Sequence, residues 1–348
     1  MKLLDAVTED VRTVSAPGIL DTVYVRVFQT LIAAGEYARA AELTNDLMFG
    51  RSPRAFCCNS GEVAYGMVHA LSGRADRALG SLSCAMSQLQ LEDSGDLLPM
   101  AQSLAAYAHA LLDNTDEAAR LSEDTAEHRY RQPAQLESVE QLMRVQATLA
   151  GDPQRLCAQL RSMARSCLDE SMVAPALECL AAAARHGDAK AAVELAEAAA
   201  LADGRWARAL YCFGAGLDAN DSALLVEAAD TALELGNVLL ANTAARAALR
   251  IVDGRAGSAD RAHARDALRI EHLSFRELRA SNTITERMKT LTPFEAEIAL
   301  RAAGQATRAE ISGALKLSPR TIDWHLGKIF DKLHVSGRSE LGEVLGQN

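Results

Sequence analysis

A helix-breaking residue recurs along residues 1–280 at a nearly constant spacing. The breaks fall at Gly35, Gly73, Asn114, Gly151, Gly187 and Gly236. The first four intervals are 38, 41, 37 and 36 residues, and the alanine-rich stretches between the breaks have high helix propensity. A period of this length is typical of α-hairpin repeats, whose stacked helix pairs share one core. The pattern predicts an all-α fold of stacked helical hairpins, with an irregular all-helical bundle as the open alternative.

Two of these units resemble tetratricopeptide repeats. The segments "GEYARA" from Gly35 and "GRADRA" from Gly73 are similar to the turn and second-helix start of that family. The resemblance implies a TPR-like α-hairpin repeat solenoid over residues 1–280, with an extended surface for a protein partner or a small-molecule effector. Most of the family's aromatic positions are missing.

Charge is divided unevenly along the chain. The net charge is −10, but residues 284–348 hold nine Lys or Arg and eight Asp or Glu. The acidity therefore lies in the long N-terminal part. The near-neutral C-terminal part can bind phosphate only through the placement of its charges.

Composition also limits the location and the chemistry. No run reaches the roughly 18 apolar residues of a membrane span, and "MKLLDAVTEDVRTV" lacks the apolar segment of a secretory signal. The seven cysteines show no paired metal spacing, which favours free thiols in a reducing compartment. We expect a cytoplasmic protein that has no membrane partner and needs no metal or cofactor.

A polar stretch, "SNTITERMKT" at 281–290, is interpreted as a linker into a C-terminal domain at 291–348. Capping boxes begin at Thr292 and Thr307, and Ser318-Pro319 forms a third helix start. The expected helices span about 293–303, 308–315, 319–333 and 337–345. Expected core residues of the first two helices are Ile298, Leu300, Ile311, Ala314 and Leu315.

The third of these helices has two distinct faces. At about 100° per residue, Ile322, Leu326 and Ile329 lie on one apolar stripe, whereas Trp324 lies on the opposite side. A short helix, a tight turn and a longer helix with a polar outer face form a helix-turn-helix, whose second helix enters the DNA major groove. This arrangement gives an outward tryptophan a role, although a scattered surface aromatic residue remains the simpler alternative.

Residues 291–341 resemble the helix-turn-helix of LuxR/NarL-type transcription factors. The matching residues are Leu291, Thr292, Glu295, Glu310, Ile311, Ser318, Thr321, His325, Lys332, Leu333, Val335, Arg338 and Leu341. Phe294 and Arg308 stand where the family has Arg and Asn. The resemblance implies a four-helix domain that binds double-stranded DNA, most often as a homodimer through the last helix.

The resemblance and the outward face together give candidate DNA-contacting residues. Those expected to face bases are Arg320, Asp323, Trp324 and Gly327. Those expected to contact phosphates are Thr307, Arg308, Ser318, Thr321, Lys328 and Lys332. Thr321 and His325 lie at the edge of the core stripe, so a scaffold role for either stays open.

Repeats followed by this domain resemble the C-terminal half of the large ATP-binding LuxR-type regulators, which include the maltose activator. No G-x-x-x-x-G-K-[ST] loop, HExxH or G-x-S-x-G motif is present, so no enzyme is expected. The resemblance implies a transcriptional regulator, more often an activator, that contacts RNA polymerase. The alternative is an interaction scaffold whose C-terminal domain serves dimerisation.

Overall fold

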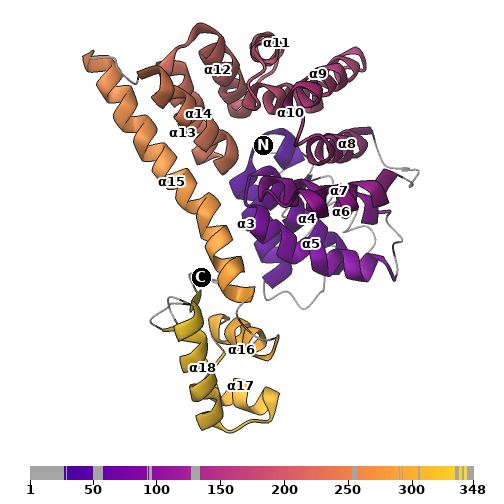
Figure 1. The fold of residues 1–348 in the computed structure, drawn as a ribbon, viewed down its shortest axis with the longest axis vertical. Coiled ribbons are helices and arrows are strands. Elements are labelled where there is room, and N and C mark those ends of the chain that lie inside the picture. The colour runs from indigo at the N-terminus through magenta and orange to yellow at the C-terminus, as the bar shows by residue number, and fades with distance from the viewer. Residues whose placement is uncertain are drawn as a thin grey trace. The chain divides into compact units, whose positions relative to one another are not determined.

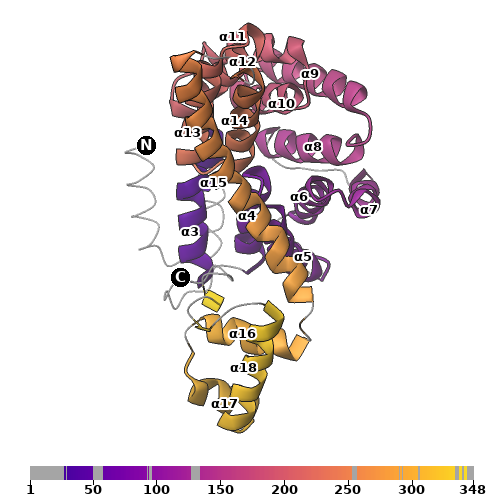
Figure 2. The same ribbon diagram turned by 60° about the vertical axis from the view of Figure 1, so that its left-hand side comes forward.

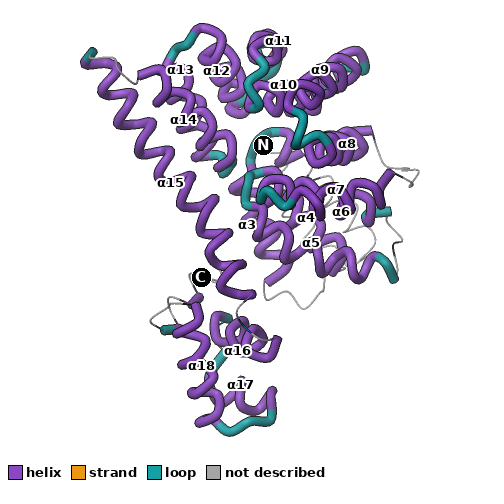
Figure 3. The backbone as a smooth tube through the Cα atoms, viewed as in Figure 1, coloured by secondary structure: helices purple, strands orange, loops and turns teal. Residues whose placement is uncertain are grey.

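The fold is described from a computed structural model. It describes residues 27–28, 30–49, 58–91, 93, 96–126, 134–252, 257–289, 291, 293–304, 306–333, 337–338 and 341–342. Within these ranges all regular elements are helices, as Figure 3 shows, in agreement with the predicted all-α class.

The described helices are given in chain order. Their bounds are α3 Tyr37–Phe49, α4 Cys58–Leu71, α5 Ala75–Leu89, α6 Leu98–Leu111, α7 Thr115–Ala126, α8 Ala134–Thr148, α9 Pro153–Asp169, α10 Val173–Arg185, α11 Ala189–Ala199, α12 Arg205–Ala219, α13 Ser222–Glu234, α14 Val238–Val252, α15 Ser258–Lys289, α16 Pro293–Ala303, α17 Arg308–Leu315 and α18 Pro319–Leu333. None of these described helices is long and apolar enough to cross a membrane.

The chain divides into two compact units, Met1–Phe275 and Arg276–Asn348. The division falls inside α15, which Figure 1 shows as one long orange helix. The stretch 281–290 was predicted as a linker, but it is helical up to Lys289. Its Asn and Thr residues have lower helix propensity than Ala, but the stretch has no Gly or Pro that would end the helix.

Consecutive helices of the N-terminal unit pack against their neighbours as hairpins (Figure 1). Predicted breaks at Gly73 and Gly187 are tight turns with φ of 93° and 89°, a left-handed conformation that favours glycine. Near Asn114 the left-handed residue is its neighbour Asp113, with φ of 59°. The stacked-hairpin prediction is confirmed at the level of helical architecture, and the tetratricopeptide name remains a prediction.

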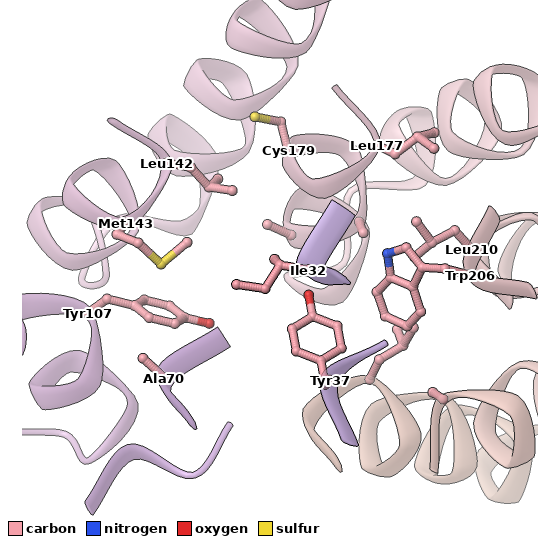
Figure 4. Packing of buried hydrophobic residues seen from close by; sticks show 14 of the residues in the cluster. Ile32, Tyr37, Ala70, Tyr107, Leu142, Met143, Leu177, Cys179, Trp206 and Leu210 are labelled. Carbon is pink, nitrogen blue, oxygen red and sulfur yellow. The ribbon is translucent and has the colours of Figure 1, made fainter. Parts of the chain in front are cut away.

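The N-terminal segment, residues 30–37, packs against the helices that follow it in the chain. In Figure 4, Ile32 and Tyr37 lie between Tyr107 on one side and Trp206 on the other. Tyr37 is 1% exposed, and its ring meets Trp206 edge-on with centroids 5.6 Å apart. Leu31, Ile32 and Tyr37 of this segment are buried, whereas the sequence suggested a solenoid with an extended free surface.

Hydrogen bonds join segments of this unit that lie far apart in the sequence. The amide of Ala38 donates to the carbonyl of Leu235 at 2.9 Å, and the amide of Leu239 donates to Ser72 at 3.1 Å. The Arg74 guanidinium donates to the Gly236 carbonyl at 2.9 Å. The turn between α13 and α14 and the first residues of α14 are therefore bonded to residues about 160–200 positions earlier in the chain, and Figure 2 shows α3 and α4 beside these helices.

The C-terminal unit has a separate apolar core. It contains Leu291, Ile298, Ala299, Ala302, Ala303, Ile311, Ile322, Leu326, Ile329 and Leu341. Two core predictions were wrong, because Leu300 is 47% exposed and Ala314 is exposed. Ala299, Ala302 and Ala303 face inward instead, since small side chains suffice where α16 crosses its neighbours.

Candidate nucleic-acid interface

The capping box predicted for the first of the paired helices is present. Thr307 Oγ1 accepts a hydrogen bond from the Glu310 amide at 3.3 Å, and the Glu310 carboxylate accepts from the Thr307 amide at 2.7 Å. These two bonds satisfy amide groups that a helix start leaves free. α17 therefore begins at Arg308, as predicted.

The turn after α17 is three residues long. Lys316 takes the left-handed conformation with φ of 53°, and its amide donates to the Ser312 carbonyl. The Ser312 hydroxyl donates to the Leu317 carbonyl. Ser318 then caps α18, since its Oγ accepts from the Thr321 amide at 3.1 Å. The predicted bounds of α16, α17 and α18 are all confirmed.

α18 presents one buried and one exposed face. Ile322 and Ile329 are fully buried and Leu326 is 4% exposed. On the other side all four residues predicted to face bases are exposed, and Trp324 retains 56% of its surface. Burial of this indole against a partner would be favourable, because it removes apolar surface from water.

Two residues that were predicted to have different roles form an ion pair with each other. Arg308 Nη1 lies 2.6 Å from Asp323 Oδ2, and both side chains are about half exposed. Arg308 was predicted to contact phosphate and Asp323 to face a base. The ion pair links the start of α17 to the outer face of α18, a relation that sequence spacing did not show.

Lys328 lies over the indole of Trp324, with Nζ 3.9 Å from the ring centroid. A cation held on an aromatic face is attracted by the electron density of the ring. The pair lies one helical turn apart on the exposed face. It therefore presents an apolar plate and a positive charge together.

His325 belongs to an aromatic cluster that the sequence did not reveal. Its ring meets Trp324 edge-on at 4.9 Å and Phe294 at 5.2 Å. Phe294 stands where the LuxR/NarL pattern has Arg, so an apolar contact between α16 and α18 occupies that position. This packing favours the scaffold role that the sequence left open for His325.

The hydroxyl groups predicted to contact phosphate all have partners within the domain. Thr307 Oγ1 contacts Glu310, and Ser318 Oγ lies 2.7 Å from Thr321 Oγ1. The Thr307 hydroxyl donates its one proton to Glu310, so a phosphate contact there would replace that bond, whereas the Ser318–Thr321 pair keeps one hydroxyl proton for a phosphate. The side chain of Lys332 lies outside the described residues, so its predicted phosphate contact stays a prediction.

The fourth predicted helix lies largely outside the described residues. Arg338, Leu341 and Gly342 are helical there, and Leu341 is buried in the core. Arg338 donates to the Ala306 carbonyl at 2.8 Å and so holds the segment before α17. Its match to the family pattern therefore corresponds to a structural contact.

Together these elements define a helix-turn-helix DNA-binding domain: a short capped helix, a three-residue turn and a longer helix with an exposed polar and aromatic face. Residues 289–345 match the model of the family described as "Bacterial regulatory proteins, luxR family". The C-terminal part of the chain is therefore a LuxR-type helix-turn-helix domain, as the sequence motifs indicated. Neither the curated proteins nor the solved structures contain a match to the chain.

The match also limits the chemistry expected of this domain. LuxR-type helix-turn-helix regulators generally bind DNA and are not enzymes. Within the described residues no group of three or more His, Cys, Asp or Glu side chains is arranged to hold a metal ion. The presence of this DNA-binding domain supports the interpretation that the protein is a transcriptional regulator.

Proposed function

We propose that this protein is a cytoplasmic transcriptional regulator that binds duplex DNA through α18, and that its N-terminal helical unit controls this binding. The single observation that carries the proposal is the exposed Trp324–Lys328 pair on a helix whose opposite face is fully packed. An apolar plate can contact a thymine methyl group or a sugar, and the adjacent ammonium can contact a phosphate.

The remaining candidates extend this reading. Arg320 lies in the first turn of α18, the part of a recognition helix that meets base edges. Gly327 has open space around its Cα, so the backbone there can approach the DNA closely. Asp323 can accept from a cytosine amino group once Arg308 turns to a phosphate.

Regulation is proposed to involve a homodimer. LuxR-type domains pair through their last helix, which here begins near Arg338, and a dimer would place two α18 helices about one turn of DNA apart. An activating role through RNA polymerase rests on family resemblance. The scaffold alternative gives no role to the exposed face of α18, so we favour DNA binding.

The proposal is tested by incubating the intact protein with a pool of random DNA duplexes and sequencing the retained molecules. We expect a motif with two-fold symmetry. The same selection with the Trp324→Ala variant should lose the motif, whereas Arg155→Ala, at an exposed residue of the N-terminal unit, should recover it. No enrichment with the intact protein would contradict the proposal and favour the scaffold.

A further inference from the structure

A mostly apolar cavity, partly open to solvent, lies in the N-terminal unit. Its volume is about 390 Å³, within the range of small-molecule binding sites. Its walls come from segments far apart in the sequence: Ile32 from the N-terminal segment, Met67 from α4, Leu142 from α8 and Met172 from the turn before α10. Such walls favour an apolar occupant, because the hydroxyl groups of a sugar would lose their hydrogen bonds to water there.

One carboxyl group lines this cavity. Glu178, on α10, accepts a hydrogen bond at Oε1 from the Trp206 indole at 2.8 Å. Burial raises the pKa of Glu178, and the Trp206 hydrogen bond and the nearby charge of Arg185 oppose that change. A carboxyl group in this setting is stabilised as an anion by a further cationic or donor group. In its ionised form Glu178 would repel an anionic ligand.

We propose that this cavity binds a small, mainly apolar molecule with one amino group, which pairs with the Glu178 carboxylate while the apolar body lies against Ile32 and Leu142. This inference deepens the proposed control of DNA binding and rests on that function only for its regulatory consequence. Binding itself concerns the N-terminal unit alone.

The site is placed where an occupant would act on the packing of the unit. Thr30, Ile32 and Ala33 line one side of the cavity, and the same segment continues into Gly35 and Tyr37, which pack on Trp206. Glu178 thus both accepts from the indole and lines the cavity. A ligand that pairs with Glu178 would therefore stabilise the packing of the N-terminal segment against Trp206.

The test uses three probes that differ in one group: 4-phenylbutylamine, 4-phenylbutan-1-ol and 4-phenylbutyrate. Binding to the full-length protein is measured by isothermal titration calorimetry. We expect the amine to bind at least tenfold tighter than the alcohol, and the carboxylate to bind most weakly. Equal affinity for amine and alcohol, or no binding by any probe, would overturn the proposal.

Variants assign the preference to the carboxyl group. Glu178→Gln keeps an acceptor for Trp206 and should reduce the amine-to-alcohol preference to near one without weakening the alcohol. Glu197→Gln, at an exposed carboxyl of α11, should leave the preference intact. Val139→Phe, which fills the cavity from α8, should weaken all three probes, with folding checked by circular dichroism. A preference that survives Glu178→Gln would overturn the proposal.

DNA binding is measured separately with the selected duplex, with and without saturating amine. If the amine binds through Glu178 and changes DNA affinity, both proposals stand. If no probe binds while a DNA motif is still selected, the cavity proposal fails and the DNA-binding function stands. If the amine binds and no motif is selected, the ligand site stands without that function.

Discussion

The guanidinium of Arg308 and the carboxylate of Asp323 form an ion pair between α17 and the outer face of α18, with Nη1 and Oδ2 2.6 Å apart. Exposed pairs of this kind contribute only about 0.2–1 kcal/mol, so a DNA phosphate can replace Asp323 at small cost. In the free protein the pair neutralises a basic residue at the proposed DNA surface. We therefore expect this pair to influence how strongly the domain binds any duplex.

Replacing Asp323 by Asn should release Arg308. We expect tighter binding to unselected duplex and a log K against log salt slope that steepens by about 0.9, the change for one more phosphate contact. The matched control is Glu297→Gln, which removes the same charge from an exposed pair with Arg301 on α16. Equal slopes for both variants would mean that net charge alone matters.

Replacing Trp324 by Ala should weaken binding to the selected site by about 1–3 kcal/mol and relax base preference at one or two positions. Thermal stability should change little, because 56% of the side chain is exposed. Trp206→Ala is the contrasting variant. That ring is 4% exposed, and its loss should destabilise the fold by about 3–5 kcal/mol. Unchanged selectivity in Trp324→Ala would remove the indole from the DNA surface.

Lys328→Ala should lower affinity for all duplexes and reduce the salt slope by about one, because a phosphate contact carries no sequence information. Binding is measured by fluorescence anisotropy over a range of salt concentrations. Lys190→Ala, at an exposed lysine on α11, controls for the loss of one positive charge. A wild-type slope in Lys328→Ala would show that this lysine does not contact phosphate.

His69 should make stability depend on pH. It is 3% exposed, neither ring nitrogen has a hydrogen-bond partner in the structure, and burial lowers its pKa to about 3. Between pH 6.5 and 3 the unfolded chain binds a proton that the folded chain does not. Stability is therefore fully present above about pH 6.5 and falls as pH decreases through that window.

The measurement is urea unfolding of wild type and His69→Phe at pH 5 and pH 7.5. The variant removes buried unpaired nitrogens beside the Tyr65 ring, so it should be more stable by about 1–3 kcal/mol, with the larger gain at pH 5. His272→Gln, at an exposed position, is the control. An equal gain at both pH values would contradict the proton linkage.

Two glycines allow the cost of a left-handed backbone to be measured apart from the cost of a close contact with Ala38. Gly187 and Gly236 have φ of 89° and 88°, but an added Cβ meets nothing at Gly187 and would lie 2.7 Å from the Ala38 nitrogen at Gly236. Gly187→Ala should cost about 1–2 kcal/mol from φ alone. Gly236→Ala should lower the free energy of unfolding in urea by clearly more than Gly187→Ala does. Equal losses would show that the backbone near Ala38 shifts to admit the methyl group without cost.

Local sequence was enough to predict the features that depend on residues close together in the chain. The caps at Thr307 and Ser318 and the apolar stripe of α18 set the bounds of the helix-turn-helix, because capping and helical periodicity act within a few residues. The exposed position of Trp324 followed from the same periodicity. For the same reason, the spaced glycines predicted helical hairpins.

Contacts between residues far apart in the sequence depend on how the helices pack. The burial of Tyr37 against Trp206, the Arg308–Asp323 pair and the cavity around Glu178 depend on how helices cross, and no local pattern encodes a crossing. Leu300 shows the same limit, since its apolar side chain predicted burial while packing of α16 through alanines left it exposed. Side-chain chemistry specifies what each helix can bury, but the geometry of packing selects which contacts form.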